Sequence, residues 1–362
     1  MKIWILGNNL TNLLLANILV KKKILIDIFF IPKTKLSNNN TRTIAISNEN
    51  HKFLNKYIKS FSTFGWPSEN IKIYSEKSSS SELFEFRIKN ENNFYLVKYN
   101  EFYKLLQNNI KNNKFVKFIK LKKYNLDFLN KKNYNIIINS DQNSPITKKF
   151  FHRIIEKKYS GLAYTTLISH QKKRNKTAVQ FFTKNGPLAF LPLSETQTSV
   201  VFSNDSSVPI EKKLIINFIK KYNIKYDIKN FSEIQKFIIK FSVLRNYFYK
   251  NILCFGDLIH KVHPLAGQGF NMTIRDVNIL SKIIDDSISL GINNGETIAQ
   301  SFEEKTKHIN FIYGTGIDFI GSFFKLDNKL DNYLSDPLFK LFKKNNYLNK
   351  YAMWISNGNT FN

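Results

Sequence analysis

One stretch of the chain combines glycines, a carboxylate and histidines in an order that could bind a ligand. It reads NILCFGDLIHKVHPLAGQGFNMTIRD over residues 251–276. An apolar run leads into Gly256-Asp257, and two glycines then flank Gln268 just before a helical pattern. Glycine has no Cβ, so its backbone can pass close to a flat or anionic ligand, and free N–H groups at a helix start can hold an anion. Asp257, at a strand end, can accept hydrogen bonds from sugar-like hydroxyls, so the stretch predicts a site for a ligand of this kind.

Glycine is scarce in this chain, which makes its placement informative. The 13 glycines among 362 residues are about half the usual share, while Lys, Asn, Ile and Phe are abundant, a bias consistent with an A/T-rich genome. A glycine that persists under such a bias is one that the structure or a ligand needs. The alternative for residues 251–276 is an ordinary strand–loop–helix junction in which Asp257 is a helix cap, and the glycine bias disfavours it.

The N-terminus has the pattern of a nucleotide-binding βαβ unit. Residues 2–6 form an apolar run that ends at Gly7, and a helical face and a second β-rich run follow as far as residue 30. In the register of the dinucleotide fingerprint G-x-G-x-x-G, the second and third glycines are replaced by Asn9 and Asn12. Asn tolerates left-handed backbone, so a turn at Asn9 is feasible, but its Cβ would stand where a pyrophosphate should approach.

Farther along the chain, the order of β-rich and helical segments favours an interleaved α/β fold. Short β segments fill residues 159–203, with a turn at Asn185-Gly186-Pro187, and an amphipathic helix covers residues 297–326. We therefore predict a Rossmann-like domain with a parallel sheet, interleaved with a β-rich substrate domain and followed by C-terminal helices. The predicted division gives 1–70, 92–155 and 250–290 to the discontinuous Rossmann-like domain, 71–91 and 156–249 to the substrate domain, and 291–362 to the helical region.

Three blocks of the chain resemble the FAD-dependent aromatic hydroxylases of the para-hydroxybenzoate hydroxylase fold. Residues 263–269, HPLAGQG, follow Gly256-Asp257 as in that family's second FAD fingerprint, in a form typical of its ubiquinone-biosynthesis branch. Residues 42–47, RTIAIS, are similar to the family's R-x-x-A-L-S stretch. Residues 178–193, AVQFFTKNGPLAFLPL, are similar to its A-x-x-x-F-x-x-x-G-P-x-A-x-L-P-L block. The resemblance extends over most of the chain and is most specific in the first and third blocks.

This resemblance implies FAD as the cofactor and an FAD-binding role for the Rossmann-like domain. Asp257 would hold the ribityl chain, the glycine loop would lie against the isoalloxazine ring, and Arg42 would contact the flavin. The Pro264 carbonyl and the Gly186-Pro187 turn would face the substrate. The cofactor-binding residues implied in this way are Gly7, Arg42, Gly256, Asp257, Pro264, Gly267, Gln268, Gly269 and Asn271.

Two positions depart from the family pattern. Asp141-Gln142 stands in place of the family's middle Asp-Gly motif. Lys98 stands where these hydroxylases often present an acidic or amide side chain to the flavin.

The activity implied is hydroxylation of an aromatic ring by reduced FAD and molecular oxygen. In the ubiquinone branch the substrate is a polyprenylated phenol or benzoquinol precursor, and the electron donor, NAD(P)H or a ferredoxin-type protein, stays open. The flavin carries the difficult step, so we assign no catalytic residue beyond the substrate-facing candidates. The alternative hypothesis is a structural or accessory subunit of a ubiquinone-biosynthesis assembly with decayed FAD binding. Asn9 and Asn12 favour this alternative, and the second fingerprint opposes it.

The net charge and the hydropathy of the chain bear on whether it binds nucleic acid or a membrane. The net charge is +28 and the pI is near 9.8, but Lys and Arg are scattered rather than gathered in an aromatic-interleaved stripe, so we expect no nucleic-acid partner. A basic exterior favours peripheral contact with an anionic membrane surface, which a lipid-tailed substrate would require. The apolar stretch 311–324 is interrupted by Asp318 and is too short to span a bilayer. We expect a cytoplasmic protein, either free or at the inner face of the membrane.

The histidines and the cysteine carry no predicted catalysis. His260 and His263 lie three residues apart, but no third ligand accompanies them, so we predict no metal site. Cys254 is the only cysteine of the chain, which excludes an internal disulfide and fits a reducing compartment. It stands within an apolar run, and we expect it in the core rather than as a nucleophile.

Overall fold

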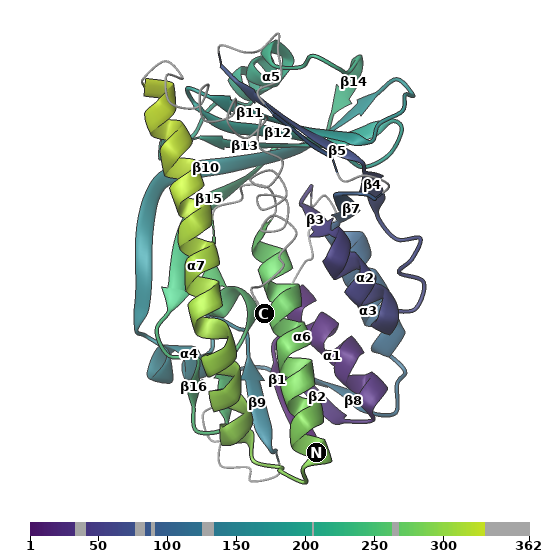
Figure 1. The fold of residues 1–362 in the computed structure, drawn as a ribbon, viewed down its shortest axis with the longest axis vertical. Coiled ribbons are helices and arrows are strands. Elements are labelled where there is room, and N and C mark those ends of the chain that lie inside the picture. Colours follow the sequence, from purple (N-terminus) through teal and green to yellow (C-terminus); the bar gives the residue numbers. More distant parts are fainter. Residues whose placement is uncertain are drawn as a thin grey trace.

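The lower half of the molecule is built on a largely parallel sheet (Figure 1). The computed structural model describes residues 1–32, 41–76, 84–87, 91–124, 134–204, 206–262 and 268–329. Within them, the strand order of this sheet is β16-β17-β9-β1-β2-β8. Its strands are β1 (Lys2–Leu6), β2 (Leu25–Phe30), β8 (Val116–Lys120), β9 (Ile136–Asn139), β16 (Phe248–Tyr249) and β17 (Ile252–Cys254). Neighbouring strands pair in parallel, except β16 with β17.

Helices bury this sheet, which explains why its strands are apolar almost throughout. The helices of this half are α1 (Leu10–Leu19), α2 (Asn48–Tyr57), α3 (Tyr99–Ile110), α4 (Pro145–Phe150), α6 (Gln268–Ser289) and α7 (Gly295–Lys329). Helix α1 packs between α3 and α6, and every one of its residues is buried. Helix α7 contacts β9, β16 and β17 and continues upward to the second sheet (Figure 1).

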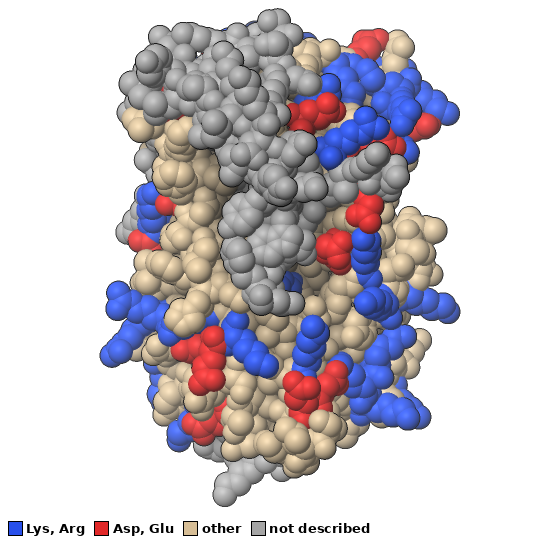
Figure 2. Space-filling model, in the orientation of Figure 1, with Lys and Arg blue, Asp and Glu red and all other residues tan. Residues whose placement is uncertain are grey.

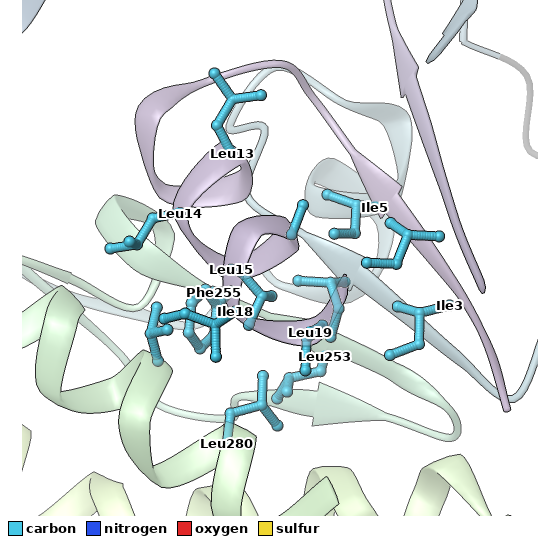
Figure 3. Close-up of a cluster of buried hydrophobic side chains, with 14 of the residues drawn as sticks. Ile3, Ile5, Leu13, Leu14, Leu15, Ile18, Leu19, Leu253, Phe255 and Leu280 are labelled. Carbon is cyan, nitrogen blue, oxygen red and sulfur yellow. The ribbon is translucent and has the colours of Figure 1, made fainter. Parts of the chain in front are cut away.

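The main hydrophobic core lies between α1, the sheet and α6. Figure 3 shows Ile3 and Ile5 of β1, the leucines of α1, Leu253 of β17 and Leu280 of α6 converging there. All of these side chains are fully buried. Because β1 and β17 are joined through this core to the same helix, the carboxyl ends of both strands are fixed beside the N-terminus of α1.

A second, mostly antiparallel sheet forms the upper half (Figure 1). Among the described residues its order is β18-β15-β10-β13-β12-β11-β5-β6, with β14 paired to β10. Its strands are β5 (Asn70–Ser75), β6 (Phe84–Arg87), β10 (Ile154–His170), β11 (Thr177–Thr183), β12 (Gly186–Pro192), β13 (Gln197–Asn204), β14 (Ile228–Phe231), β15 (Gln235–Leu244) and β18 (His260–Lys261). Helix α5 (Lys212–Lys221) buries Ile215 and Ile219 in the core of this half.

A small sheet and a short connection position the candidate site between the two halves. The small sheet has the order β3-β7-β4, from β3 (Thr43–Ser47), β7 (Phe94–Lys98) and β4 (Trp66–Ser68). The connection runs from β17 of the first sheet to β18 of the second through a single turn at Gly256–Leu258. Gly256-Asp257 therefore lies where the chain passes from one sheet to the other.

The predicted fold class is confirmed: a parallel Rossmann-like sheet is interleaved with a β-rich part and followed by a long helix. The residue bounds of the domain division stay a prediction. Cys254 is fully buried, as expected, and burial raises the pKa of its thiol. Among the described helices, none is both long and apolar enough to cross a membrane.

Charged side chains are spread over the surface. On the face shown in Figure 2, Lys and Arg lie over both halves and interleave with Asp and Glu. Ion pairs such as Lys176–Glu69 (2.9 Å) and Lys157–Asp318 (2.8 Å) belong to this pattern. Exposed pairs of this kind contribute little to stability.

Candidate functional site

The turn from β1 into α1 uses one glycine and one helix-capping asparagine. Gly7 has a φ of +102°, a left-handed conformation that favours glycine. Its N–H donates to the Phe29 carbonyl (2.8 Å), which fixes the turn to the end of β2. Asn9 is extended, with a φ of −114°, and its side-chain oxygen accepts from the Asn12 N–H (3.0 Å). A left-handed Asn9, which the sequence allowed, is not needed here, because Gly7 makes the turn and Asn9 is the N-cap of α1.

Asn12, at the third glycine position, is turned into the protein. Its side-chain amide donates to the carbonyls of Leu6 (2.9 Å) and Gly7 (2.7 Å), and the residue is fully buried. These two bonds satisfy the carbonyl of Leu6, the last residue of β1, and that of Gly7, which follows it. The buried Asn12 side chain therefore stabilises the turn between β1 and α1.

Gly256 lets the second fingerprint pack directly on α1. Its φ is +64°, and a Cβ at this position would lie 2.7 Å from the Thr11 methyl group. The single helical turn that starts at Gly256 leaves Asp257 exposed. The Asp257 carboxylate is thus held at the strand end, beside the first turn of α1.

Tyr99 joins Arg42, Asp257 and the start of α1 into one cluster. The Arg42 guanidinium lies over the Tyr99 ring, 5.1 Å from its centroid, and the Tyr99 N–H donates to the Arg42 carbonyl (3.0 Å). Burial raises the pKa of the Tyr99 phenol; the Arg42 charge opposes this and the Asp257 charge adds to it. The sequence did not predict Tyr99. Its position in the sequence could have indicated it, because Tyr99 directly follows Lys98, and the family resemblance places Lys98 beside the flavin.

The residues that follow β9, a third strand of the parallel sheet, also lie at this edge. The Asn9 side-chain amide donates to the Ser140 hydroxyl (2.7 Å). The Gln142 side chain donates to the Asp257 carbonyl (3.2 Å) and accepts from Lys261 (2.7 Å). The carboxyl ends of β1, β9 and β17 therefore meet here, which is where open parallel sheets bind ligands.

The start of α6 is locked to β3 by Asn271. This buried side chain donates to the Ala45 carbonyl (2.9 Å), and its oxygen accepts from the Ser47 N–H (2.9 Å) and the Asn50 amide (2.9 Å). Both ends of the Asn271 amide are thus bonded to the protein, and a contact with a cofactor would come from the backbone here. Gln268 and Gly269 form the first turn of α6, while His263, Pro264 and Gly267 lie outside the described residues.

The Gly186-Pro187 turn begins β12 of the upper sheet. Gly186 has a φ of +118°, and a Cβ there would overlap the Ser203 carbonyl oxygen at 2.0 Å. This glycine is therefore required by strand pairing. That Gly186 and Pro187 face the substrate stays a prediction. Lys98, the N-cap residue of α3, lies 3.5 Å from Glu101 in an ion pair.

His260 belongs to a buried polar network behind the site. Its Nε2 lies 2.9 Å from the Asp276 carboxylate, and both side chains are almost fully buried. Asp276 also accepts from the Asn310 amide (3.2 Å) and lies 3.4 Å from the Arg275 guanidinium. The network joins β18, α6 and α7, so His260 has a structural partner. Within the described residues no group of three metal-ligating side chains is found.

An apolar cluster lies where the upper sheet meets α6 and α7. Phe182 of β11, Met272 of α6 and Ile317 of α7 are buried together, with Val262 and Tyr313 packed against them. Val262 is the last described residue before the fingerprint loop. We call this cluster the apolar wall; it packs against Val262, which precedes residues 263–267 in the sequence.

Comparison with known proteins gives matches of one kind. Residues 195–289 match the FAD binding domain family. A ubiquinone biosynthesis monooxygenase, COQ6, from Caenorhabditis elegans is 24% identical over 211 residues, or 46% of this chain and 47% of that protein. The 3-demethoxyubiquinol 3-hydroxylase of Escherichia coli is 29% identical over 150 residues, or 38% of this chain and 37% of that protein. The matched part thus spans less than half the length of these relatives.

Solved structures share the fold over nearly the whole chain. The p-nitrophenol 4-monooxygenase PnpA of Pseudomonas putida superposes with a TM-score of 0.74 at 10% identity, covering 98% of this chain and 97% of that one. PqsL of Pseudomonas aeruginosa, described as a probable FAD-dependent monooxygenase, gives a TM-score of 0.67 at 13% identity, covering 87% and 94%. The chain has the fold of FAD-dependent monooxygenases, with FAD as the indicated cofactor, and part of it is similar in sequence to a ubiquinone biosynthesis monooxygenase and a 3-demethoxyubiquinol 3-hydroxylase.

Proposed function

We propose that the chain is a FAD-dependent monooxygenase that hydroxylates the aromatic ring of a polyprenylated phenol or benzoquinol precursor in ubiquinone biosynthesis. The observation that carries this proposal is the convergence of the Gly7 turn, the start of α1, Arg42 and Asp257 at one sheet edge. Helix N–H groups and a guanidinium suit a diphosphate, and a carboxylate suits the ribityl hydroxyls. The residues present at this edge therefore fit FAD.

Each of these groups has a part in the proposed reaction. Asp257 accepts hydrogen bonds from the ribityl chain, while Arg42 and the start of α1 face the diphosphate. Gln268 and Gly269 present backbone to the flavin ring, together with Pro264 and Gly267. When bound and reduced, FAD supplies the activation of molecular oxygen. The protein holds the substrate ring in a site from which water is excluded. The electron donor, NAD(P)H or a ferredoxin-type protein, is left open.

The apolar wall supports the lipid-tailed substrate class. Phe182, Met272 and Ile317 come from three different elements and are buried together beside Val262. An apolar cluster of this kind would stabilise a prenyl chain packed against it, because the contact removes the chain from water. In this proposal the Gly186-Pro187 turn and the Pro264 carbonyl face the aromatic ring, and the wall holds the tail.

Helix α7 supports a peripheral position at the membrane. Its upper half exposes large apolar side chains. These residues are Phe311, Ile312, Phe319, Ile320 and Leu326, which are between 45% and 68% exposed. Together with a net charge of +28, this face suits the interface of an anionic bilayer. We place the protein at the inner face of the membrane, where it would meet its substrate.

A non-catalytic subunit of a ubiquinone-biosynthesis assembly is the second candidate. It is favoured by the capping role of Asn9, whose side chain takes up the Asn12 N–H that could otherwise face a diphosphate (3.0 Å). It predicts a folded protein that binds no flavin.

Purification and genetic rescue test the two candidates together. We expect the protein to carry a flavin absorbance spectrum and to restore ubiquinone in a bacterium that lacks its own ring hydroxylase of this type. Gly269→Val should abolish both, because its side chain would occupy space beside the flavin and press on Val262, whose methyl group would be 3.3 Å from the new Cβ. Gly316→Val is the matched control, since no atom lies within 4 Å of that position.

Each result separates the candidates. Flavin and rescue that both depend on Gly269 support the hydroxylase. Rescue by a colourless Gly269→Val protein would instead show that the chain acts as a structural partner.

A further inference from the structure

Two lysine ammonium groups lie over the same buried tyrosine ring in the upper half of the molecule, near α5 and β14 (Figure 1). Lys173, between β10 and β11, has its Nζ 5.5 Å from the centroid of the Tyr226 ring. Lys225, between α5 and β14, has its Nζ 5.2 Å from the same centroid. The Lys173 ammonium also donates to the backbone carbonyl of Lys225. The two side chains therefore form one small cluster that holds two positive charges near each other.

No carboxylate pairs with either ammonium in the part of the chain that the structure describes. Other lysines of the connection between β10 and β11 do have such partners. Lys172, next to Lys173, pairs with Glu195 (3.1 Å). Lys176 pairs with Glu69 (2.9 Å). The cluster of Lys173 and Lys225 thus has the cations of an ion pair but not the anion.

The Lys225 amine can lose its proton and still keep its hydrogen bonds. Its Nζ donates to the Asn175 side-chain oxygen (3.2 Å) and to the Thr177 carbonyl (3.2 Å), which are both neutral acceptors. A neutral amine has two N–H bonds for these two acceptors and a lone pair in addition. Burial and the nearby charges of Lys173 and Lys72 lower the pKa of Lys225 to about 8. Part of the amine is therefore a nucleophile at physiological pH.

Carbon dioxide would turn this amine into the anion that the cluster lacks. The lone pair of the Nζ forms a bond to the carbon, one C–O π bond breaks with its electrons moving to oxygen, and one proton leaves the nitrogen for water. The product is a carbamate with a single negative charge, and the step needs no oxidant, reductant or leaving group. Beside Lys173, the carbamate oxygens would accept a charge-assisted hydrogen bond, so the repulsion between two cations would become an attraction.

We propose that Lys225 is a site of reversible carbamate formation with carbon dioxide, and that the Lys173 ammonium is the partner of the carbamate. A free anion such as inorganic phosphate is disfavoured, because Lys225 already uses two N–H groups on protein acceptors. The proposal does not depend on FAD or on the proposed hydroxylation. It joins the connection after α5 to the connection between β10 and β11 through an ion pair that requires carbon dioxide.

Chemical trapping of carbamates on the full-length protein tests the proposal. The protein is incubated with isotopically labelled bicarbonate near neutral pH, carbamates are alkylated with triethyloxonium ion, and the peptides are identified by mass spectrometry. We expect the label on Lys225 and not on Lys176. Lys173→Gln should lower the labelling of Lys225 about tenfold, because it removes both the partner of the carbamate and a charge that favours the neutral amine. Lys176→Gln is the matched control, since Lys176 pairs with Glu69, and Lys225 should then be labelled as in the parent.

The outcomes are distinct, and circular dichroism of each variant separates a loss of labelling from a loss of fold. Labelling of Lys225 that requires Lys173 supports the proposal. No label on Lys225, or equal labelling of Lys225 and Lys176 in the parent, would overturn it. Labelling that is unchanged in Lys173→Gln would overturn it too, since the ion pair would then play no part. Calorimetric binding of inorganic phosphate that is lost in Lys173→Gln, without any carbamate, would show a site for a free anion instead.

Discussion

At the scale of single residues, the site uses asparagine amides where related fingerprints use bare backbone. Asn9 caps α1, and Asn12 binds the two carbonyls that end β1. A side-chain amide carries both a donor and an acceptor, so it can close a turn that glycine would leave open. As a consequence, fewer donors remain for a ligand, because an N–H group that is hydrogen-bonded within the protein is not available to the ligand.

Asp257 is the residue whose loss should affect FAD most directly. It is exposed at the strand end, and its charge, like that of Arg42, acts on the Tyr99 phenol. Asp257→Ala removes a charged acceptor and should weaken FAD binding about tenfold to hundredfold, equivalent to roughly 1.5–3 kcal/mol. The measurement is the FAD Kd by fluorescence quenching, with thermal unfolding of the apoprotein as control. Retention of flavin equal to that of the parent would show that the carboxylate does not contact the cofactor.

Asn9→Gly tests the same site at the start of α1, opposite Asp257. The change frees the Asn12 N–H and removes a Cβ, so FAD should bind more tightly. Stability should fall by only a few tenths of a kcal/mol, the usual cost of replacing an Asn cap by Gly. Asn9→Asp is the companion variant: it keeps a cap oxygen but adds a negative charge, and FAD should bind more weakly. Unchanged affinity in both variants would mean that Asn9 does not face the diphosphate.

At the scale of elements, the contact between the second fingerprint and α1 depends on Gly256. We expect Gly256→Ala to destabilise the protein by about 2 kcal/mol, of which roughly half comes from the left-handed backbone and the rest from the overlap with Thr11. The overlap part should be recovered in a Gly256→Ala/Thr11→Ser double variant, which removes the Thr11 methyl group. Urea unfolding of both variants measures this. If the double variant is no more stable than the single one, the 2.7 Å contact is not the cause.

The elements that could be predicted from the sequence are those whose signals are local. The β1–Gly7–α1 unit and the β17–Gly256–Asp257 connection each follow from an apolar run that ends at a glycine. The role of Tyr99 could not be predicted, because it depends on how α3 packs against a turn about 90 residues earlier in the chain. The inward orientation of Asn12 could not be predicted for a related reason. Aligning the chain with the G-x-G-x-x-G fingerprint shows that Asn12 replaces a glycine, but not which atoms its side chain bonds to.

At the scale of the whole molecule, the exposed apolar side chains of α7 lead to a prediction about membrane binding. Double replacement of Ile312 and Phe319 by Ser should reduce cosedimentation with vesicles of phosphatidylglycerol and phosphatidylethanolamine by about tenfold or more. Each apolar side chain that becomes buried in the bilayer contributes roughly 1.5–3 kcal/mol to the free energy of membrane binding. Replacing Val208 and Leu290 by Ser is the control, since these residues are about equally exposed (69% and 71%) and lie in connections outside α7. An equal loss in the control pair would mean that α7 is not the contact face.

The sheet that holds the site also has a consequence for the order of folding. Its central strand β1 pairs with β9 at residues 136–139, and β9 pairs in turn with β17 at residues 252–254. A chain emerging from the ribosome therefore keeps one edge of β9 unpaired until most of its length has been synthesised. Exposed parallel edges are slow to pair and prone to association. Asp257 follows β17 directly, so the flavin edge is assembled after this last pairing. We therefore expect early refolding to be insensitive to added FAD, with the cofactor captured only once the central sheet has closed.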